Sequence, residues 1–191
     1  MARPQTITDQ RLLVATGDVI GRHGPGFTLA HVAAEAGVSV GTVAQRFGSK
    51  SGLLRALTAH FTGEVAVTMR AAAESAKSAV DGLRAAAVVT HVGLGDAKTA
   101  ANHLGQLGVD LVDPVLRELL GEHYAAMESE LRRAFRAAAA ELPRAPSASR
   151  AAQVLLAVVN GVSMDWSIRP KGRLEDRLAA DVDAVLDGWR G

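Results

Sequence analysis

Apolar residues recur at the spacing of an α-helix along almost the whole chain. The first such stretch, residues 8–23, carries its apolar residues on one side, which predicts an amphipathic helix. Two shorter helices are predicted over 29–36 and 40–47, because Thr28 and Ser39 directly before them are typical N-cap residues. Glycine and proline interrupt the pattern between these three helices, so they are expected to be joined by tight turns.

The same spacing continues through the rest of the chain in longer stretches. Six further helices are expected at 50–76, 80–92, 98–111, from 114 to beyond 135, at 150–168 and at 174–189. The sequence shows no strand pattern of convincing length and no internal repeat. The chain is therefore predicted to be all-α, with about nine helices.

Composition is consistent with a helical protein and excludes several kinds of chemistry. Of the 191 residues, 48% are hydrophobic and 21% are charged, which allows a sizeable core in a soluble chain. Cysteine is absent, which excludes disulfides, thiolate catalysis and Cys-ligated metal sites. The N-terminus has no apolar signal-peptide segment, and the longest strongly apolar run, 154–159, is too short to span a bilayer. We therefore expect a cytoplasmic protein with no membrane partner.

The second and third predicted helices have the pattern of a helix-turn-helix. Val32 and Ala33 on one helix and Val43 on the other lie where the two would touch, and Gly37 allows the sharp turn between them. The opposite side of the 40–47 helix is polar or small. Gln can bind adenine through two hydrogen bonds and Arg can bind guanine or phosphate, so this side suits a DNA groove.

Candidate DNA contacts lie on this side of the helix and at nearby helix N-termini, where backbone amides are suited to phosphate. They are Thr28, Ser39, Val40, Gly41, Thr42, Ala44, Gln45, Arg46 and Lys50. Taken singly, the hydroxyl residues are explained more simply as helix caps, and Arg46 and Lys50 as solvated surface charges. Their combination at this spacing favours DNA contact.

Charge is distributed unevenly along the chain. Residues 1–60 contain six Lys and Arg against three acidic residues, whereas the remainder contains fifteen against seventeen. A basic first part and a slightly acidic second part indicate that only the first touches a polyanion. The difference is small and adds little by itself.

Residues 26–54 resemble the N-terminal domain of the TetR family of bacterial transcriptional regulators, in the stretch GFTLAHVAAEAGVSVGTVAQRFGSKSGLL. The similarity rests on G-F-T, on A-x-x-A-G-V-S across the turn, on G-T-x-x-x-x-F and on S-K-x-x-L-L. One departure is Ala44, where the family usually has an aromatic residue, often Tyr, that packs against the DNA backbone. Its absence leaves a smaller contact, such as one to a thymine methyl, and gives Gln45 and Arg46 a larger share.

The resemblance implies an all-helical homodimer with a three-helix helix-turn-helix DNA-binding domain, placed here in residues 1–50. Residues 51–191 would form a larger helical domain for ligand binding and dimerisation. A small molecule that binds this second domain would release the DNA. The expected protein is a repressor whose partners are a double-stranded DNA operator, a small-molecule effector and a second copy of the chain.

The 150–168 helix is apolar on nearly every side, which indicates that it is buried on more than one side. A second subunit is a natural cover, because Ala157 and Gly161 would let another helix come close. The expected dimer interface uses this helix and the last one, through Val154, Ala157, Val158, Gly161, Leu178, Val182, Val185, Leu186 and Trp189. The alternative is that the helix is simply the core of one subunit. A dimer would place two reading helices roughly 34 Å apart and predict a near-palindromic operator.

The effector is expected in a cavity between the helices of the second domain. Candidate lining residues are Phe61, Met69, His91, Asn102, His103, His123, Tyr124, Met127, Asn160, Met164 and Trp166. Their apolar, Met-containing character favours a hydrophobic or amphipathic effector. Asn160 interrupts an apolar helix, and its amide needs a partner, either an effector or a contact across the dimer. The histidines are explained more simply as structural residues, and without metal-ligand spacing we expect no metal and no cofactor.

Two other classes of function remain open from the sequence. An enzyme is not expected, since the chain has no nucleophile elbow, P-loop, dinucleotide fingerprint or HExxH motif. An all-helical interaction module could use its helix-turn-helix to bind protein instead of DNA. Salt separates these binding modes, because affinity for DNA falls steeply as salt rises.

Overall fold

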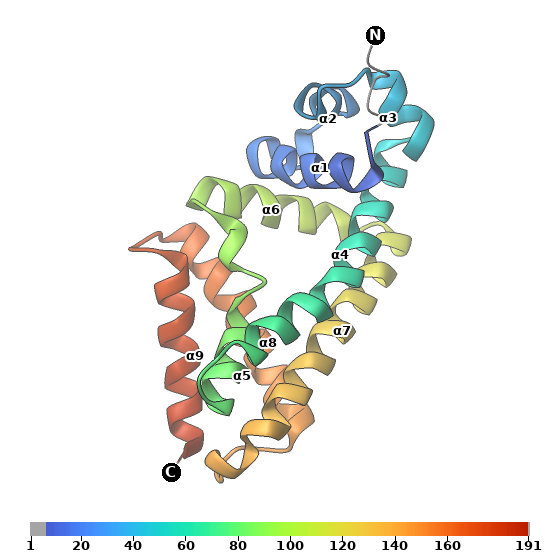
Figure 1. Ribbon diagram of the computed structural model, residues 1–191. Coiled ribbons are helices and arrows are strands. Elements are labelled where there is room, and N and C mark those ends of the chain that lie inside the picture. Colours follow the sequence, from blue (N-terminus) through green and yellow to red (C-terminus); the bar gives the residue numbers. More distant parts are fainter. Residues whose placement is uncertain (1–6, 191) are drawn as a thin grey trace.

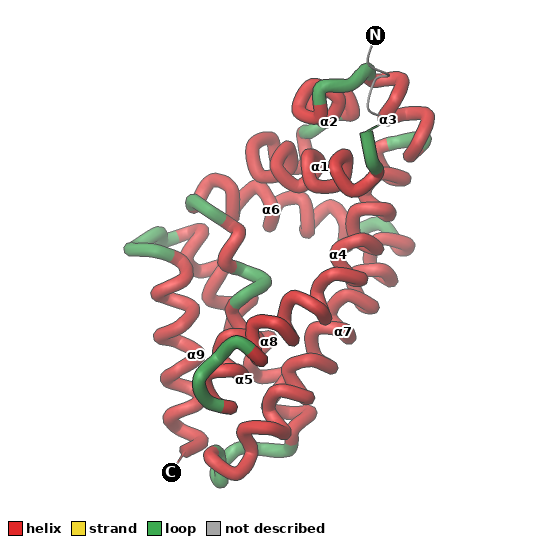
Figure 2. Tube along the Cα trace, viewed as in Figure 1, coloured by secondary structure: helices red, strands yellow, loops and turns green. Residues whose placement is uncertain are grey.

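The computed structural model describes residues 7–190 and consists of α-helices joined by turns (Figure 1, Figure 2). Nine α-helices and no strand are found in this part of the chain, which confirms the all-α prediction. The helices are α1 Asp9–His23, α2 Leu29–Ala36, α3 Val40–Phe47, α4 Lys50–Glu74, α5 Ala79–Val88, α6 Ala97–Asp110, α7 Pro114–Ala138, α8 Ala148–Ile168 and α9 Leu174–Arg190. Short 3-10 helices lie at Gly24–Gly26 (η1), Val92–Leu94 (η2) and Ala139–Glu141 (η3). The outermost residues of the two expected domains, 1–6 and 191, lie outside the described residues.

The first four helices begin at side chains that accept hydrogen bonds from free backbone amides. Thr8, Thr28, Ser39 and Ser49 cap α1 to α4 in this way, as their positions in the sequence predict. Gly37 ends α2 with φ of 68°, a left-handed conformation that is strained for residues with a Cβ. Because these local signals are strong, the bounds of α2 and α3 agree with the prediction residue for residue.

The helices α1, α2 and α3 form a small unit with its own hydrophobic core, at the top of Figure 1. Phe27 and Val43 are among the residues buried at its centre. The same core includes leucines from the first turns of α4, namely Leu53, Leu54 and Leu57. The core of the N-terminal unit therefore includes side chains that follow residue 50, because the start of α4 covers the apolar sides of the shorter helices.

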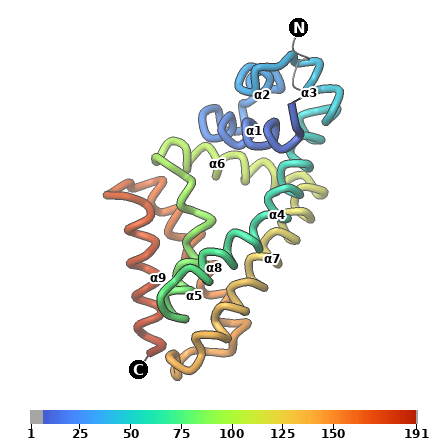
Figure 3. The backbone as a smooth tube through the Cα atoms, viewed as in Figure 1, coloured from blue at the N-terminus to red at the C-terminus, as the bar shows by residue number. Residues whose placement is uncertain are grey.

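The helices α4 to α9 surround a second, larger core. The helices α4 and α7 run side by side, α5 and α8 pack against α7, and α9 lies at the outer edge against α8 and α5 (Figure 1). The helix α6 lies across this bundle and contacts α1. The C-terminus lies far from the first three helices (Figure 3), so the N-terminal unit projects from one end of the molecule.

By length and composition alone, α8 is apolar enough to cross a membrane, with a mean hydropathy of 1.3. In the fold it packs against α6, α7 and α9 as a core helix. Its buried residues are Ala151, Ala152, Leu155, Leu156, Val159, Val162, Ser163 and Trp166. This burial accounts for one side of its apolar pattern and leaves the opposite side open to solvent.

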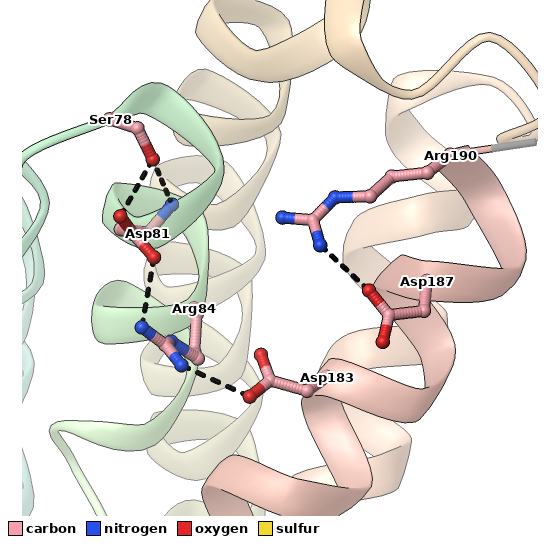
Figure 4. A network of polar contacts seen from close by, with 6 residues as sticks. All are labelled: Ser78, Asp81, Arg84, Asp183, Asp187 and Arg190. Carbon is pink, nitrogen blue, oxygen red and sulfur yellow. Dashed lines mark hydrogen bonds and ion pairs between the residues drawn. The ribbon is translucent and has the colours of Figure 1, made fainter.

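Charged side chains join α9 to α5 (Figure 4). Arg84 on α5 donates to Asp81 on its own helix at 2.9 Å and to Asp183 on α9 at 3.0 Å. These side chains are partly exposed, so the bond between the helices contributes at most about 1 kcal/mol. It nevertheless helps to set which side of α9 faces the rest of the molecule.

This orientation corrects part of the expected dimer interface. Three of the expected interface residues are fully buried in the core of their own subunit: Leu178, Val182 and Leu186. Val185 is partly buried against the same core, and Trp189 packs edge to face on Phe135 with ring centroids 6.1 Å apart. The apolar side of α9 is used within the subunit, so Leu178, Val182 and Leu186 are not accessible to a partner, whereas Val185 and Trp189 stay partly exposed.

Candidate DNA-binding and effector sites

The helix α3 presents one side to solvent at the outer end of the N-terminal unit. Val43 is completely buried, and the helix face opposite to it is open. Gly41 and Gln45 on this face are exposed, Thr42 and Ala44 on its flanks are partly exposed, and Val40 is exposed in the first turn. Gln45 makes no hydrogen bond within residues 7–190, so its amide is free to pair with a base edge. The helix therefore brings together five of the expected DNA contacts.

The hydroxyl residues of this region are bonded within their own helices. Thr28 Oγ1 accepts from the His31 amide at 3.3 Å, and His31 Nδ1 accepts from the Thr28 amide at 3.3 Å. Ser39 Oγ accepts from the Thr42 amide at 3.1 Å and lies 3.0 Å from the Thr42 hydroxyl. Thr28 and Ser39 are thus helix caps, the simpler of the two explanations, although both remain exposed at helix N-termini that suit phosphate.

Arg46 is bound to Asp9 at the start of α1, a contact that the sequence did not indicate. Arg46 Nη1 lies 2.5 Å from Asp9 Oδ1, and the two side chains are 25% and 65% exposed. A pair this open to solvent contributes no more than about 1 kcal/mol. A DNA phosphate or guanine can therefore displace Asp9 at small cost, and until then Asp9 holds Arg46 in one position.

Lys50 is turned inward, against the expectation that it contacts phosphate. Its ammonium donates to the carbonyl oxygens of Pro25 at 2.6 Å and Phe27 at 2.8 Å, and it lies 4.1 Å from the centre of the Phe27 ring. Burial lowers the pKa of Lys50 from its ordinary value, and the nearby Asp110 partly offsets this. Since two of its three donors are used, Lys50 ties α4 to the turn before α2 instead of facing DNA. The sequence placed Lys50 beside a helix start but could not show that this turn passes next to it.

A cavity of about 400 Å³ lies in the second unit, between α6, α7 and α8. Five of the expected effector residues line it: His91, His103, Tyr124, Asn160 and Met164. Sequence reasoning missed the other lining residues, which include Thr90, Leu94, Ala100, Leu104 and Leu107. Residues 100, 103, 104 and 107 share one side of α6, and this helical spacing was the signal that could have identified them.

Two further hollows adjoin the cavity. One of about 430 Å³ is lined by Phe61 and His123 among others, and one of about 580 Å³ reaches Gly17 and Gly21 on α1. Thr90 borders all three, so they lie side by side. The expected effector residues Phe61 and His123 are therefore near the cavity but outside its walls.

The remaining four effector candidates do not line the cavity. Met69 and Met127 are buried in the hydrophobic core. Trp166 donates from Nε1 to the Gly172 carbonyl at 3.3 Å and borders a separate cleft at the turn between α8 and α9. Asn102 donates from Nδ2 to the Gly21 carbonyl on α1 at 2.7 Å. All four were chosen as effector contacts by residue type, but the side of the helix on which each lies determines whether it reaches the cavity.

Neutral polar groups face the cavity. Thr90 Oγ1 lies 3.0 Å from His91 Nδ1, and His91 Nε2 lies 3.2 Å from Asn160 Oδ1. Because an amide oxygen only accepts, this contact places the His91 proton on Nε2. Burial lowers the pKa of His91 and of His103 and raises the pKa of Tyr124, which keeps all three groups uncharged near neutral pH.

Acidification is expected to destabilise the protein through these buried imidazoles. Burial holds the pKa of folded His91 below its ordinary value of 6.5, so the unfolded chain binds the proton more readily. Stability is therefore complete above about pH 7 and falls as the pH drops below 6.5. Urea unfolding at pH 7.5 and pH 5.5 measures this loss, and His91→Gln should reduce it because the variant has no imidazole to protonate at position 91. The exposed His23→Gln is the control, and an undiminished loss in His91→Gln would assign the effect to other groups.

The helix α6 connects the cavity to the N-terminal unit. Asn102 binds the Gly21 carbonyl, and the neighbouring His103, which lines the cavity, lies against the same glycine. A Cβ added at Gly21 would come within 3.0 Å of Thr99 Cγ2 and 3.3 Å of His103 Nε2. A molecule that moves His103 therefore also disturbs the contact between α6 and α1.

The solvent-facing side of α8 is a stripe of small and apolar residues. It consists of Ala157, Gly161, Met164 and Ile168, of which Ile168 is 70% exposed. Val154 and Val158 are partly exposed, and a Cβ at Gly161 would meet open space. On α9 the exposed small residues are Ala180, Ala184 and Gly188. The α8 part of the expected dimer interface is therefore accessible, whereas three of the expected α9 residues are buried in their own subunit.

Sequence profiles of known families match both units of the chain. The profile of bacterial regulatory proteins of the tetR family matches residues 12–57. A profile described as the C-terminal part of BetI-type transcriptional repressors matches residues 107–190. No curated protein sequence matches the chain.

Solved structures share the fold over nearly the whole chain. A TetR-family regulator from Rhodococcus sp. is 25% identical, covers 93% of this chain and 98% of its own, and superposes with a TM-score of 0.70. SCO0520 from Streptomyces coelicolor, a TetR transcriptional regulator, is 21% identical, covers 96% of this chain and 98% of its own, and has a TM-score of 0.69. FadR from Bacillus subtilis, solved in complex with stearoyl-CoA, is 19% identical, covers 95% of this chain and 99% of its own, and has a TM-score of 0.76.

The two profiles cover the N-terminal unit with its exposed α3 and most of the helical second unit, and regulators share the complete arrangement. These findings support a DNA-binding transcriptional regulator. The chain belongs to the TetR family of bacterial regulatory proteins.

Proposed function

We propose that this protein is a dimeric repressor that binds a near-palindromic operator in the cytoplasm and is released by a small, largely apolar effector. The observation that supports it most is the free side of α3, where Gln45 has no partner within residues 7–190. The match of the second unit to BetI-type repressors supports the repressor role. FadR of Bacillus subtilis is in complex with stearoyl-CoA, which supports a small-molecule effector for this chain.

Base reading is assigned first to Gln45 and Ala44. The exposed Gln45 amide can bind adenine through two hydrogen bonds, and the Ala44 methyl fits beside a thymine methyl. Gly41 on the same face has no Cβ and allows the backbone to approach DNA closely. This set is smaller than one with an aromatic residue at position 44, so the operator preference depends more on Gln45.

Arg46 is assigned to a second kind of contact, in which it exchanges Asp9 for DNA. The exposed Asp9 carboxylate occupies the guanidinium in the free protein. On DNA the same guanidinium would bind a guanine edge or a phosphate, either of which can accept two hydrogen bonds from it. Asp9 then lowers the affinity for any DNA by the free energy of the broken pair.

Dimerisation is assigned to the exposed stripe of α8, supported by the small residues on α9. Ala157 and Gly161 are accessible, and Met164 and Ile168 extend the apolar surface in the same direction. Two copies that pack through this stripe would bury apolar surface that is otherwise in water. Such a dimer has two N-terminal units and reads two half-sites about one turn of DNA apart.

Release by the effector is assigned to α6. A molecule in the cavity contacts His103, and the neighbouring Asn102 holds the Gly21 carbonyl of α1. An effector that shifts α6 therefore changes the position of the N-terminal unit. In the dimer this alters the spacing of the two α3 helices, and the operator is bound less tightly.

Selection of bound sequences from random DNA duplexes tests the function. The native protein is expected to enrich a near-palindrome, and its affinity should fall steeply with salt. Gln45→Ala should relax the preference at one adenine in each half-site, by about 1–3 kcal/mol. Asp9→Asn should raise affinity severalfold for all sequences, and this gain should vanish in the Arg46→Ala background.

The outcomes separate the parts of the proposal. Enrichment of a single half-site would count against the dimer, whereas no enrichment at all would remove the regulator function itself. Tighter binding of Asp9→Asn that persists without Arg46 would show that the carboxylate acts on DNA directly. Retention of a protein partner with little salt dependence would favour the interaction module.

A further inference from the structure

The cavity between α6, α7 and α8 contains polar groups whose hydrogen-bonding capacity is not used within residues 7–190. Asn160 Oδ1 accepts from His91, which leaves both hydrogens of the Asn160 amide without a partner. The Tyr124 hydroxyl and the His103 ring make no hydrogen bond to other described residues. None of these groups is fully buried, so water meets them in the free protein, and a molecule that enters the cavity can take the place of that water.

The walls of the cavity contain no formal charge. None of its twelve lining residues is Asp, Glu, Lys or Arg. Burial also disfavours protonation of His91 and His103 and ionisation of Tyr124. A charged group placed among these residues would lose hydration and meet no opposite charge in the lining, because the charged side chains nearby, such as Asp18 and Glu64, line only the adjoining hollows.

Ser163 does not offer a further donor, because its hydroxyl already donates to the Val159 carbonyl of the same helix at 2.8 Å. The Thr90 hydroxyl is engaged with His91. The donors that remain are therefore the Asn160 amide and the Tyr124 hydroxyl, from two different helices, with His103 on a third. Donors from facing helices select an acceptor atom placed between them.

We infer that the effector is an uncharged molecule whose hydrogen-bond acceptor, a carbonyl or similar oxygen, is bound by the Asn160 amide and the Tyr124 hydroxyl. This inference rests on the proposed effector-released regulator and names the chemical class of its effector. The apolar body of the molecule lies against Leu94, Leu104 and Leu107 on the cavity wall. A longer body continues past Thr90 into the neighbouring hollow at Phe61.

Three probes with the same eight-carbon chain test this assignment: octan-2-one, octanoate and octylammonium. Isothermal titration calorimetry at pH 7.5 measures their binding to the native dimeric protein without DNA. Octan-2-one is expected to bind at least about tenfold more tightly than either ion, because only the ketone enters without desolvating a charge. Tyr124→Phe removes only the hydroxyl and should weaken the ketone about fivefold, as expected for one neutral hydrogen bond.

Asn160→Leu keeps the side-chain volume and removes the amide, so it should weaken the ketone by a similar factor. The matched control is Gln153→Leu, which removes an exposed amide two turns earlier on the same helix and should leave ketone binding unchanged. Far-UV circular dichroism and thermal unfolding verify that each variant is folded. Asn160→Leu also removes the hydrogen bond to His91. If this loss destabilises the variant, the effect of Tyr124→Phe on ketone binding decides the result.

The inference is overturned if octanoate or octylammonium binds as tightly as the ketone, if no probe binds, or if both cavity variants bind the ketone as the native protein does. Operator binding is measured in parallel without probes. If the protein binds its operator but the three probes do not bind in the expected order of affinity, only the proposed class of effector is wrong. If the ketone binds as expected but the protein binds no operator, the assignment of the cavity stands and the proposed regulator function is wrong.

Discussion

Gly52→Ala is expected to destabilise the N-terminal unit by about 3 kcal/mol or more, at the upper end of the cost of overpacking. Gly52 lies in the first turn of α4, and a Cβ there would overlap the carbonyl oxygen of Phe47 at the end of α3. The obstacle is backbone, so it is not relieved by rotation of a side chain. The variant can accommodate the Cβ only if α3 moves away from α4. Gly52→Ala should therefore lower the free energy of unfolding, whereas Ala in place of Gly within a helix usually raises it.

Urea unfolding and fluorescence anisotropy with a labelled operator measure the two consequences. Operator affinity is expected to fall by more than about tenfold, or 1.4 kcal/mol, because α3 is displaced from its position against α2. Gly63→Ala is the control in the same helix, since a Cβ there meets nothing within 4 Å, and it should stabilise the protein by up to about 1 kcal/mol. Equal effects of the two substitutions would show that α3 and α4 are not in close contact.

Phe27→Ala is expected to cost about 3–5 kcal/mol, the range for loss of a buried aromatic side chain. Phe27 is 1% exposed and is one of the largest side chains in the small N-terminal core. The substitution also removes the ring beneath the Lys50 ammonium, which contributes about another 1 kcal/mol. The N-terminal unit should then unfold under conditions in which α7 to α9 stay folded.

Amide hydrogen exchange resolves this prediction by region. Protection should be lost in α1 to α3 and kept in α7 and α8, whose residues belong to the second core. Phe61→Ala is the matched control, because Phe61 is 44% exposed and its loss should change stability little. Loss of protection throughout the chain would show that the two cores unfold as one cooperative unit.

Local signals account for most of what could be predicted about the fold. N-cap residues, Gly37 and the apolar spacing are properties of neighbouring residues, so α2 and α3 were predicted with correct bounds. The later helices were predicted with errors of a few residues, as at α5, which ends at Val88 where the sequence suggested 92. Their ends depend on 3-10 turns such as η2, whose formation is decided by packing.

Contacts between distant residues account for what could not be predicted. Nothing in the sequence near Arg46 points to Asp9, and nothing near Lys50 points to the carbonyl of Pro25, yet both cations are held by these partners. The same holds for α9, where amphipathic spacing identifies an apolar side but not which helices it faces. Leu178 and Val182 were therefore assigned from the sequence to the contact with a partner subunit, whereas they lie in the core of their own subunit.

The free side of α3 has a consequence for how operator preference changes in evolution. The side chains of residues 44 and 45 make no hydrogen bond within the described part of the chain, and surface substitutions of this kind change the free energy of unfolding by at most about 0.5 kcal/mol. Duplicated copies of such a gene could diverge at these two positions while the protein keeps its fold. Position 46 is different, because a change there also breaks the pair with Asp9. New operators are thus reached through positions 44 and 45 with little risk to folding, and a combinatorial library would begin there.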